Sequence, residues 1–171
     1  MKGFRPQEGD CNPYFFTYID KVEGHDILSA LIANLPESIH LLESMPADKW
    51  DYAYAAGKWT IKEAILHIID TERIMAYRAL RIARNDKTAL PGFEQDDYVP
   101  FSGANDRSPE SLVTEWKAVR EATVQQVKYF TDNMWAHRGT ASNSPATPLA
   151  LAYIIAGHEL HHIGIIRDRY L

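Results

Sequence analysis

The chain has 171 residues and a formal net charge of −5, with 46% hydrophobic and 24% charged residues. This length predicts one domain, residues 1–171, and the composition is that of a soluble globular protein, with no apolar run near the ~18 residues of a membrane span. The negative net charge argues against nucleic acid as a partner, because phosphate binding requires a clustered basic surface.

The N-terminal segment, residues 1–20, has scattered charges and no apolar stretch that ends in small residues, so nothing in it resembles a secretory signal. The chain's one cysteine, Cys11, cannot form an internal disulfide, which fits a reducing compartment. No charge pattern beside Cys11 would lower the pKa of its thiol, so we expect a bystander rather than a nucleophile. We therefore predict a cytoplasmic protein.

Helix start and stop signals predict four long helices. The first spans about residues 26–44, and Pro36 should kink or interrupt it. The second spans residues 60–84 and begins at Thr60, which has capping-box spacing to Glu63.

The third helix, residues 108–130, and the fourth, residues 147–169, each begin with a capping hydroxyl followed by proline, whose missing N–H costs nothing at the first helical position. Residues 85–106 are rich in Pro, Gly, Asp and Asn and predict a long crossover loop. A second irregular stretch, residues 133–146, precedes the last helix, and no Val/Ile alternation suggests strands. The expected fold is all-α, a four-helix bundle with a long crossover.

Basic residues recur along the second helix: Arg73, Arg78, Arg81 and Arg84. Because Asp70 and Glu72 interleave with them, we favour a solvated helix face over a phosphate-binding surface. Several aromatic residues could shape a pocket, although core packing is the more frequent role at helical spacing. They are Trp59, Tyr77, Phe93, Tyr98 and Trp116.

Two histidines lie in the apolar stripe of the last helix. At about 100° per residue, His158 and His162 share an arc of about 100° with aliphatic residues. Residues four apart have Cβ atoms about 5–6 Å apart, which lets two imidazoles converge on one ion. The pair could instead be core histidines, although each unsatisfied nitrogen would cost about 1–3 kcal/mol. Spacing alone leaves the two interpretations evenly balanced.

His67 of the second helix lies beside that helix's apolar stripe and could supply a third ligand. The pattern alone slightly favours a partly exposed histidine at the border of the stripe. Residues 158–162 also match the metalloprotease pattern His-Glu-x-x-His. We disfavour a protease, because its longer pattern would require glycine and histidine where Ile165 and Asp168 stand.

Several segments together resemble the DinB/YfiT-like superfamily of metal-binding four-helix bundles. The resemblance covers most of the chain and is carried by residues 57–63 leading to His67, and by residues 70–73, 91–98 and 157–162. It implies that His67, His158 and His162 hold a Zn²⁺ or Ni²⁺ ion whose coordination shell is completed by water. Proteins of this superfamily often form homodimers, so we expect a homodimer here.

The resemblance also implies a range of activities. Family members with known activity are thiol S-transferases that use low-molecular-weight thiols such as bacillithiol, or mycothiol-dependent isomerases, and others are regarded as metal-dependent hydrolases. Three neutral imidazoles leave the charge of the ion uncompensated and one position open, as at catalytic rather than structural zinc. Asp70 or Glu159 would either support the ligands or lie on the solvated surface.

Three functions follow as hypotheses. In the leading one, the metal ionises a small thiol that attacks an electrophilic small molecule. In the second, a metal-dependent hydrolase, water replaces the thiol and Glu159 is the catalytic base. The third is a noncatalytic metal-binding or interaction bundle.

Overall fold

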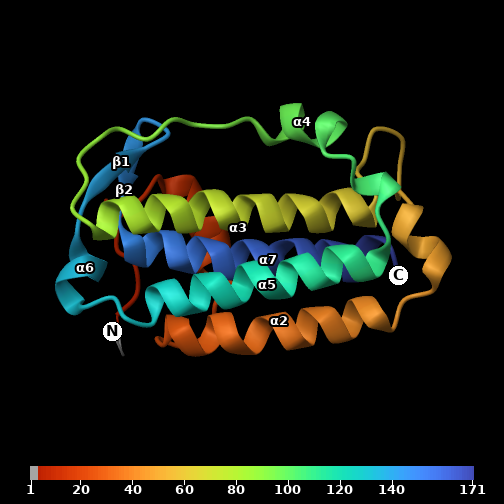
Figure 1. The fold of residues 1–171 in the computed structure, drawn as a ribbon, viewed down its shortest axis with the longest axis horizontal. Coiled ribbons are helices and arrows are strands. Elements are labelled where there is room, and N and C mark those ends of the chain that lie inside the picture. Colours follow the sequence, from red (N-terminus) through yellow and green to blue (C-terminus); the bar gives the residue numbers. More distant parts are fainter. Residues whose placement is uncertain (1–3) are drawn as a thin grey trace.

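Four long helices lie alongside one another: α2 (Ile27–Glu43), α3 (Ile61–Ala83), α5 (Pro109–Val127) and α7 (Pro148–Arg169) (Figure 1). The computed structural model describes residues 4–171. Residues 1–3, part of the stretch in which we expect no secretory signal, lie outside the described residues. Helices α3 and α2 each pack against both α7 and α5, so α5 and α7 occupy opposite corners. The predicted all-α four-helix bundle is confirmed.

The helix starts follow the capping signals of the sequence. Thr60 Oγ1 accepts a hydrogen bond from the Glu63 amide at 3.1 Å, and Glu63 Oε2 accepts one from the Thr60 amide at 2.8 Å. Both bonds of the predicted capping box are therefore present. Ser108 and Thr147 cap α5 and α7 in the same way, through their side-chain hydroxyls.

Helix α2 continues through Pro36, so the predicted interruption does not occur. Its N-cap is Asp26, whose side chain accepts from the Ser29 amide at 3.4 Å. A proline inside a helix costs about 3 kcal/mol, because it removes one hydrogen bond and crowds the preceding turn. Buried apolar side chains on both sides of Pro36 offset this cost by packing against the bundle: Leu31, Leu35, Ile39 and Leu42.

The chain between α3 and α5 crosses over the bundle as expected (Figure 1), but it is not wholly irregular. It contains the short helix α4 (Gln95–Tyr98) and the 3-10 turns η3 (Val99–Phe101) and η4 (Ala104–Asp106). Near its end, Asn105 Nδ2 donates to Glu63 Oε1 at 3.0 Å and the Asn105 carbonyl oxygen accepts from Lys62 Nζ at 3.2 Å. These bonds fix the end of the crossover to the first turn of α3.

The expectation that no strands occur is wrong. Between the short helix α6 (Asp132–Ala136) and α7, strands β1 (Gly139–Ala141) and β2 (Ser144–Ala146) form an antiparallel hairpin. Ser142 and Asn143 connect them with positive φ angles of 51° and 57°, the backbone that suits a two-residue hairpin turn. The strands are short and built from small residues, so they lack the alternation that predicts a sheet.

The hairpin also holds the start of the crossover. The Leu90 amide donates to the Thr140 carbonyl oxygen at 2.9 Å, and the Leu90 carbonyl oxygen accepts from the Ser142 amide at 3.0 Å. The crossover is thus tied down at both ends, at the hairpin and at the start of α3.

The N-terminal segment packs on α7. It contains the 3-10 turn η1 (Pro13–Phe15) and the short helix α1 (Phe16–Ile19). Arg5 donates to the carbonyl oxygens of Ile19, Val22 and Gly24 at 2.6–2.8 Å, which holds the segment together.

Helix α7 combines the length and mean hydropathy, 1.3, of a membrane span. Within the bundle, however, 72% of that apolar window is buried. The apolar character of α7 is accounted for by its contacts with α1, α2 and α3, as expected of a core helix.

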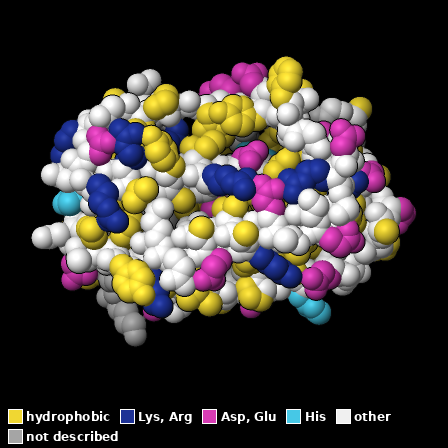
Figure 2. Space-filling model, in the orientation of Figure 1, with side chains coloured by type: hydrophobic (Ala, Val, Ile, Leu, Met, Phe, Trp, Pro, Cys, Tyr) yellow, Lys and Arg dark blue, Asp and Glu magenta, His cyan; other side chains and the backbone are white. Residues whose placement is uncertain are grey.

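The arginines of α3 do not share one solvated face, contrary to our expectation. Arg73 and Arg84 are exposed, and Arg73 forms an ion pair with Glu115 at 2.5 Å. Arg78 is buried, because its side chain lies under the crossover and donates to the Pro91 carbonyl oxygen at 2.6 Å. On the face that Figure 2 shows, basic and acidic side chains are interspersed.

Candidate metal centre

Three histidines from two helices meet inside the bundle. Helix α3 contributes His67, and α7 contributes His158 and His162 from successive turns. The Nε2 atom of His158 lies 3.0 Å from that of His67 and 3.1 Å from that of His162, and the three candidate ligand atoms all lie within 4.8 Å of one another. His67 is 6% exposed, so it faces the interior rather than a solvated border.

Burial keeps all three imidazoles neutral. Desolvation lowers the pKa of His67 to about 4, against a smaller opposing effect of Asp96. Desolvation and the neighbouring histidines lower the pKa of His162 to about 3 and that of His158 well below its usual range. At neutral pH each ring therefore has one nitrogen with a free lone pair, the state that a metal ligand requires.

Hydrogen bonds among the three rings cannot account for both close nitrogen–nitrogen contacts of His158. The Nε2 atom of His158 has two nitrogen neighbours, at 3.0 and 3.1 Å. In a neutral imidazole that atom either donates one proton or accepts with one lone pair, so at most one of the two contacts is a good hydrogen bond. Zn²⁺ with ligand nitrogens at about 2.0–2.1 Å in tetrahedral geometry holds them about 3.3 Å apart. The two separations that involve His158, 3.0 and 3.1 Å, are close to this value.

Aromatic rings surround the cluster. The Trp59 ring lies 4.8 Å from the His67 ring and stacks at 6.3 Å on that of His162. The Tyr18 ring packs edge-on against His158 at 5.3 Å. These rings cover part of the cluster and shield the histidines from water on those sides.

Two cavities reach the cluster from different sides. The first, of about 380 Å³, contacts His162. Its other walls include Tyr54, Lys58, Trp59, Ile165 and Tyr170. The second, of about 270 Å³, contacts His158. Its other walls include Tyr18, Thr71, Met75, Arg78 and Phe93. Asp96, exposed on α4, lines both cavities, so the crossover forms their shared wall.

Of the aromatic residues that the sequence analysis considered as possible pocket walls, some line a cavity and others do not. Trp59 and Phe93 line the first and second cavities respectively. Trp116 is fully buried in the core, Tyr77 is exposed, and Tyr98 lies beside a much smaller cavity next to His67.

The two candidate carboxylates do not join the histidine cluster directly. Asp70 lies beside His67 in the small cavity; it is half-buried, and burial raises the pKa of its carboxyl group. Glu159 lines neither the cavity at His162 nor the cavity at His158, and it is fully buried. It accepts a hydrogen bond from Ser38 Oγ at 2.6 Å and forms an ion pair with Arg120 at 2.8 Å.

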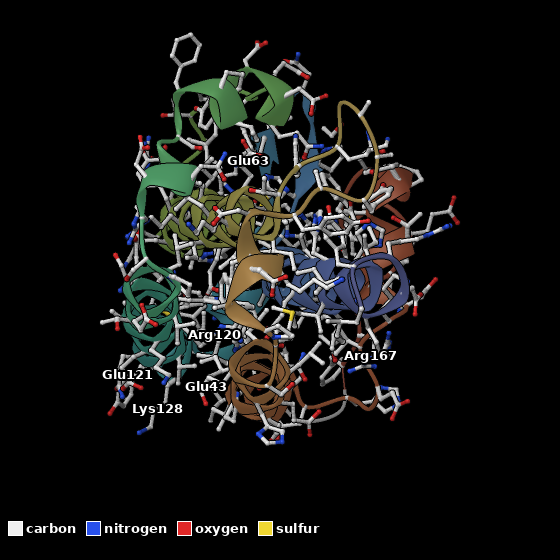
Figure 3. The ribbon with its side chains drawn as sticks, turned by 90° about the vertical axis from the view of Figure 1, so that its right-hand side faces the viewer. Glu43, Glu63, Arg120, Glu121, Lys128 and Arg167 are labelled. Atoms are coloured by element: carbon white, nitrogen blue, oxygen red, sulfur yellow. The ribbon has the colours of Figure 1, made fainter. Side chains whose placement is uncertain are left out.

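Arg120 is the centre of a buried charge network. It donates two hydrogen bonds of 2.9 Å to Glu72, which is buried rather than part of a solvated face. Figure 3 shows Arg120 among the four helices, while Glu121 and Lys128 of the same chain segment lie at the outer side. The contacts of Glu159 are thus those of a residue that ties α7 to α2 and α5.

The fold and the site define a four-helix-bundle protein with a three-histidine cluster of metal-ligand type, in which His67 and His158 are buried and His162 is partly buried. The chain belongs to the DinB superfamily, whose sequence model matches residues 30–166. A candidate metal-dependent hydrolase of Oceanobacillus iheyensis is 24% identical over 131 residues, which cover 74% of this chain and 73% of that protein.

One solved structure shows the same fold. YfiT from Bacillus subtilis, described as a probable metal-dependent hydrolase with an unusual four-helix bundle topology, aligns with a TM-score of 0.72. The alignment covers 96% of this chain and 90% of YfiT at 16% sequence identity.

Proposed function

We propose that the chain is a metal-dependent transferase in which His67, His158 and His162 hold a divalent ion, Zn²⁺ or Ni²⁺, and a small thiol attacks an electrophilic small molecule. The presence of two cavities at the histidine cluster carries this proposal, since one contacts His162 and the other His158. Transfer between two organic reactants requires room for both, whereas hydrolysis requires room for one reactant and a water molecule.

The protein's own groups define the chemistry. When bound, the ion would supply positive charge and an open coordination position, which lower the pKa of a thiol or a water molecule. The neutral imidazoles add no compensating negative charge, and the rings of Trp59 and Tyr18 exclude solvent. In the proposed reaction the sulfur–carbon bond forms as the bond from the attacked carbon to its leaving group breaks, and the leaving group departs with that electron pair. We assign the thiol proton to the Asp96 carboxylate, which lines both cavities.

Hydrolysis is the second candidate, and the descriptions of the two similar proteins favour it. Water would then replace the thiol, and one cavity would hold the substrate. Glu159, the base we expect from the sequence, is engaged with Ser38 and Arg120, so we propose Asp96 as the base here as well. A loss of hydrolysis in Asp96→Asn but not in Glu159→Gln would support this assignment.

A homodimer, a cytoplasmic location and a small-molecule substrate, without nucleic acid or membrane as partner, belong to the same proposal. Size-exclusion chromatography with light scattering tests the first of these. A noncatalytic bundle is the remaining alternative, and it predicts bound metal without turnover.

Metal content should be measured first, by elemental analysis of tag-free protein. We expect about one ion per chain, lost in His67→Ala and His158→Ala but retained in His40→Ala, which removes an exposed histidine of α2. The metallated protein is then tested with thiols plus electrophiles, and separately with esters and amides. Thiol conjugation that requires the three histidines supports the transferase. Ester or amide cleavage alone supports the hydrolase, and a folded, metal-free wild type overturns both.

A further inference from the structure

Arg78 carries a buried positive charge that no acidic side chain of residues 4–171 balances by an ion pair. Its side chain is 4% exposed. Nη2 donates to the Pro91 carbonyl oxygen at 2.6 Å and to Ser142 Oγ at 3.0 Å, and Nη1 contacts Met75 Sδ at 3.6 Å. The guanidinium also lies over the Phe93 ring, 5.6 Å from its centroid. These neutral groups orient the guanidinium without neutralising it.

Arg120, the other buried arginine, has acidic partners. Arg120 is 3% exposed, binds Glu72 through two hydrogen bonds of 2.9 Å and forms an ion pair with Glu159. Removing a charge from water without a counter-charge is strongly unfavourable, which explains why a structural arginine is paired in this way. The missing partner of Arg78 therefore points to a ligand.

Arg78 lines the second cavity, of about 270 Å³, together with His158. Thr71 lines the same cavity and is 3% exposed, and its Oγ1 atom has no hydrogen-bond partner. A buried hydroxyl left without a hydrogen-bond partner destabilises the fold. A guanidinium without a counter-charge and a hydroxyl without a hydrogen-bond partner thus line the same cavity, which argues for a polar ligand there.

Helix geometry places these groups in a row. At about 100° per residue, His67, Thr71 and Arg78 lie within about 40° of one another on α3. Arg78 follows His67 by about three turns, roughly 16 Å along the axis, and long helical side chains lean back toward the N-terminus. A ligand with one end at the histidines would pass Thr71 and reach the guanidinium with its other end.

The other charged groups that line this cavity select the type of anion. They are Glu94 and Asp96, both exposed on the crossover. Two carboxylates near the opening repel a doubly charged phosphate more strongly than a single carboxylate. A carboxylate also forms charge-assisted hydrogen bonds with a guanidinium.

We propose that the second cavity binds a small molecule through a carboxylate held by Arg78, with the opposite end of that molecule at His67, His158 and His162. This inference rests on the proposed function, because it assigns the carboxylate to the thiol reactant and leaves the first cavity for the electrophile. Arg78 is thus a specificity-determining residue.

The test measures binding of straight-chain mercaptocarboxylates of increasing length, each compared with the amide of the same length. Cobalt-loaded protein reports the bound thiol through its thiolate-to-metal absorption. We expect the carboxylate to bind at least about tenfold more tightly than the amide, and only when the chain is long enough to reach Arg78. Equal affinity of acid and amide at every length in the wild type overturns the inference.

Variants locate the preference. Arg78→Met should lower the affinity for the carboxylate to that for the amide, and Arg78→Lys, which keeps the charge, should retain part of the preference. Arg84→Met, which removes an exposed arginine of the same region, should retain all of it. A folded Arg78→Met that still prefers the carboxylate overturns the inference, and Arg78→Lys provides the comparison if Arg78→Met does not fold.

Two further outcomes separate this inference from the proposed function. If thiols bind the cobalt but acid and amide bind alike, the transferase proposal stands and the role of Arg78 fails. If no thiol binds the cobalt but thiol-free carboxylates bind in an Arg78-dependent manner, as measured by calorimetry, the carboxylate site stands and the thiol reaction fails.

Discussion

Gly157 of α7 touches the backbone of Tyr18. A Cβ atom at Gly157 would lie 2.1 Å from the Tyr18 carbonyl oxygen, a contact that no side chain tolerates. Because the Tyr18 ring packs on His158, this close approach connects the N-terminal segment to the histidine cluster.

Gly157→Ala should therefore destabilise the protein by about 1–3 kcal/mol, because α1 must move away from α7. Gly164→Ala is the matched control, since the added Cβ meets open space on the same helix. There the gain in helix propensity should stabilise the protein by up to about 1 kcal/mol. Urea unfolding measures both. Equal effects of the two substitutions would contradict the close contact.

Arg120→Met should be among the most damaging single substitutions. It leaves the carboxylates of Glu72 and Glu159 buried without their counter-charge. We therefore expect the free energy of unfolding to fall by about 3–5 kcal/mol. Lys117→Met removes an exposed lysine from the same helix, 3.8 Å from Glu43, and should change the free energy of unfolding by less than about 1 kcal/mol. A small effect of Arg120→Met would show that the buried charges are hydrated.

The metal-free protein should lose stability on acidification. The pKa of His67 is lowered to about 4 and that of His162 to about 3 in the folded chain, against a usual value of 6.5. Below about pH 6.5 the unfolded state binds more protons than the folded state, so the free energy of unfolding falls as the pH decreases toward 4. Denaturant unfolding of chelator-treated protein across this range measures the slope.

A variant identifies the groups responsible for this pH dependence. His67→Gln, which does not titrate in this range, should show a shallower slope than the wild type. An unchanged slope in His67→Gln would assign the titration to other residues.

Cys11 should be unreactive in the folded protein. Its side chain is 4% exposed, and burial together with the neighbouring Asp10 raises the pKa of the thiol to about 11. Alkylation at neutral pH should be slow in the native protein and fast in denaturant, because the reactive form is the thiolate. Mass spectrometry after timed labelling measures the ratio. Rapid labelling of the native protein would contradict this environment.

Local signals predict much of this fold. Thr60, Ser108 and Thr147 each mark a helix start through bonds made within a single turn, which can be inferred from residue order alone. Pro36 shows the limit of that reasoning, because whether a proline interrupts a helix depends on the burial of its neighbours. The hairpin turn at Ser142 and Asn143 was not predicted, because its strands are held by Leu90, a residue distant in the sequence.

The site shows the same division. His158 and His162 could be paired from their spacing, since they lie on successive turns of one helix. The approach of His67 and the cavity walls from α1 and the crossover depend on tertiary packing. Burial of Arg78 was missed because its neighbours in sequence, including the exposed Tyr77 and the partly exposed Arg81, give no sign of the chain that covers it. A charged helix face that is exposed to solvent and one that another segment covers have similar sequence patterns.

Because the crossover is anchored at Leu90 and Asn105, different residues determine the stability of the bundle and the shape of its cavities. The bundle supplies the histidines and most of the buried surface. The segment between the anchors supplies Phe93, Glu94 and Asp96 to the cavity walls. Substitutions confined to that segment should therefore change the shape and charge of the cavities with little change in folding stability and without moving the three histidines.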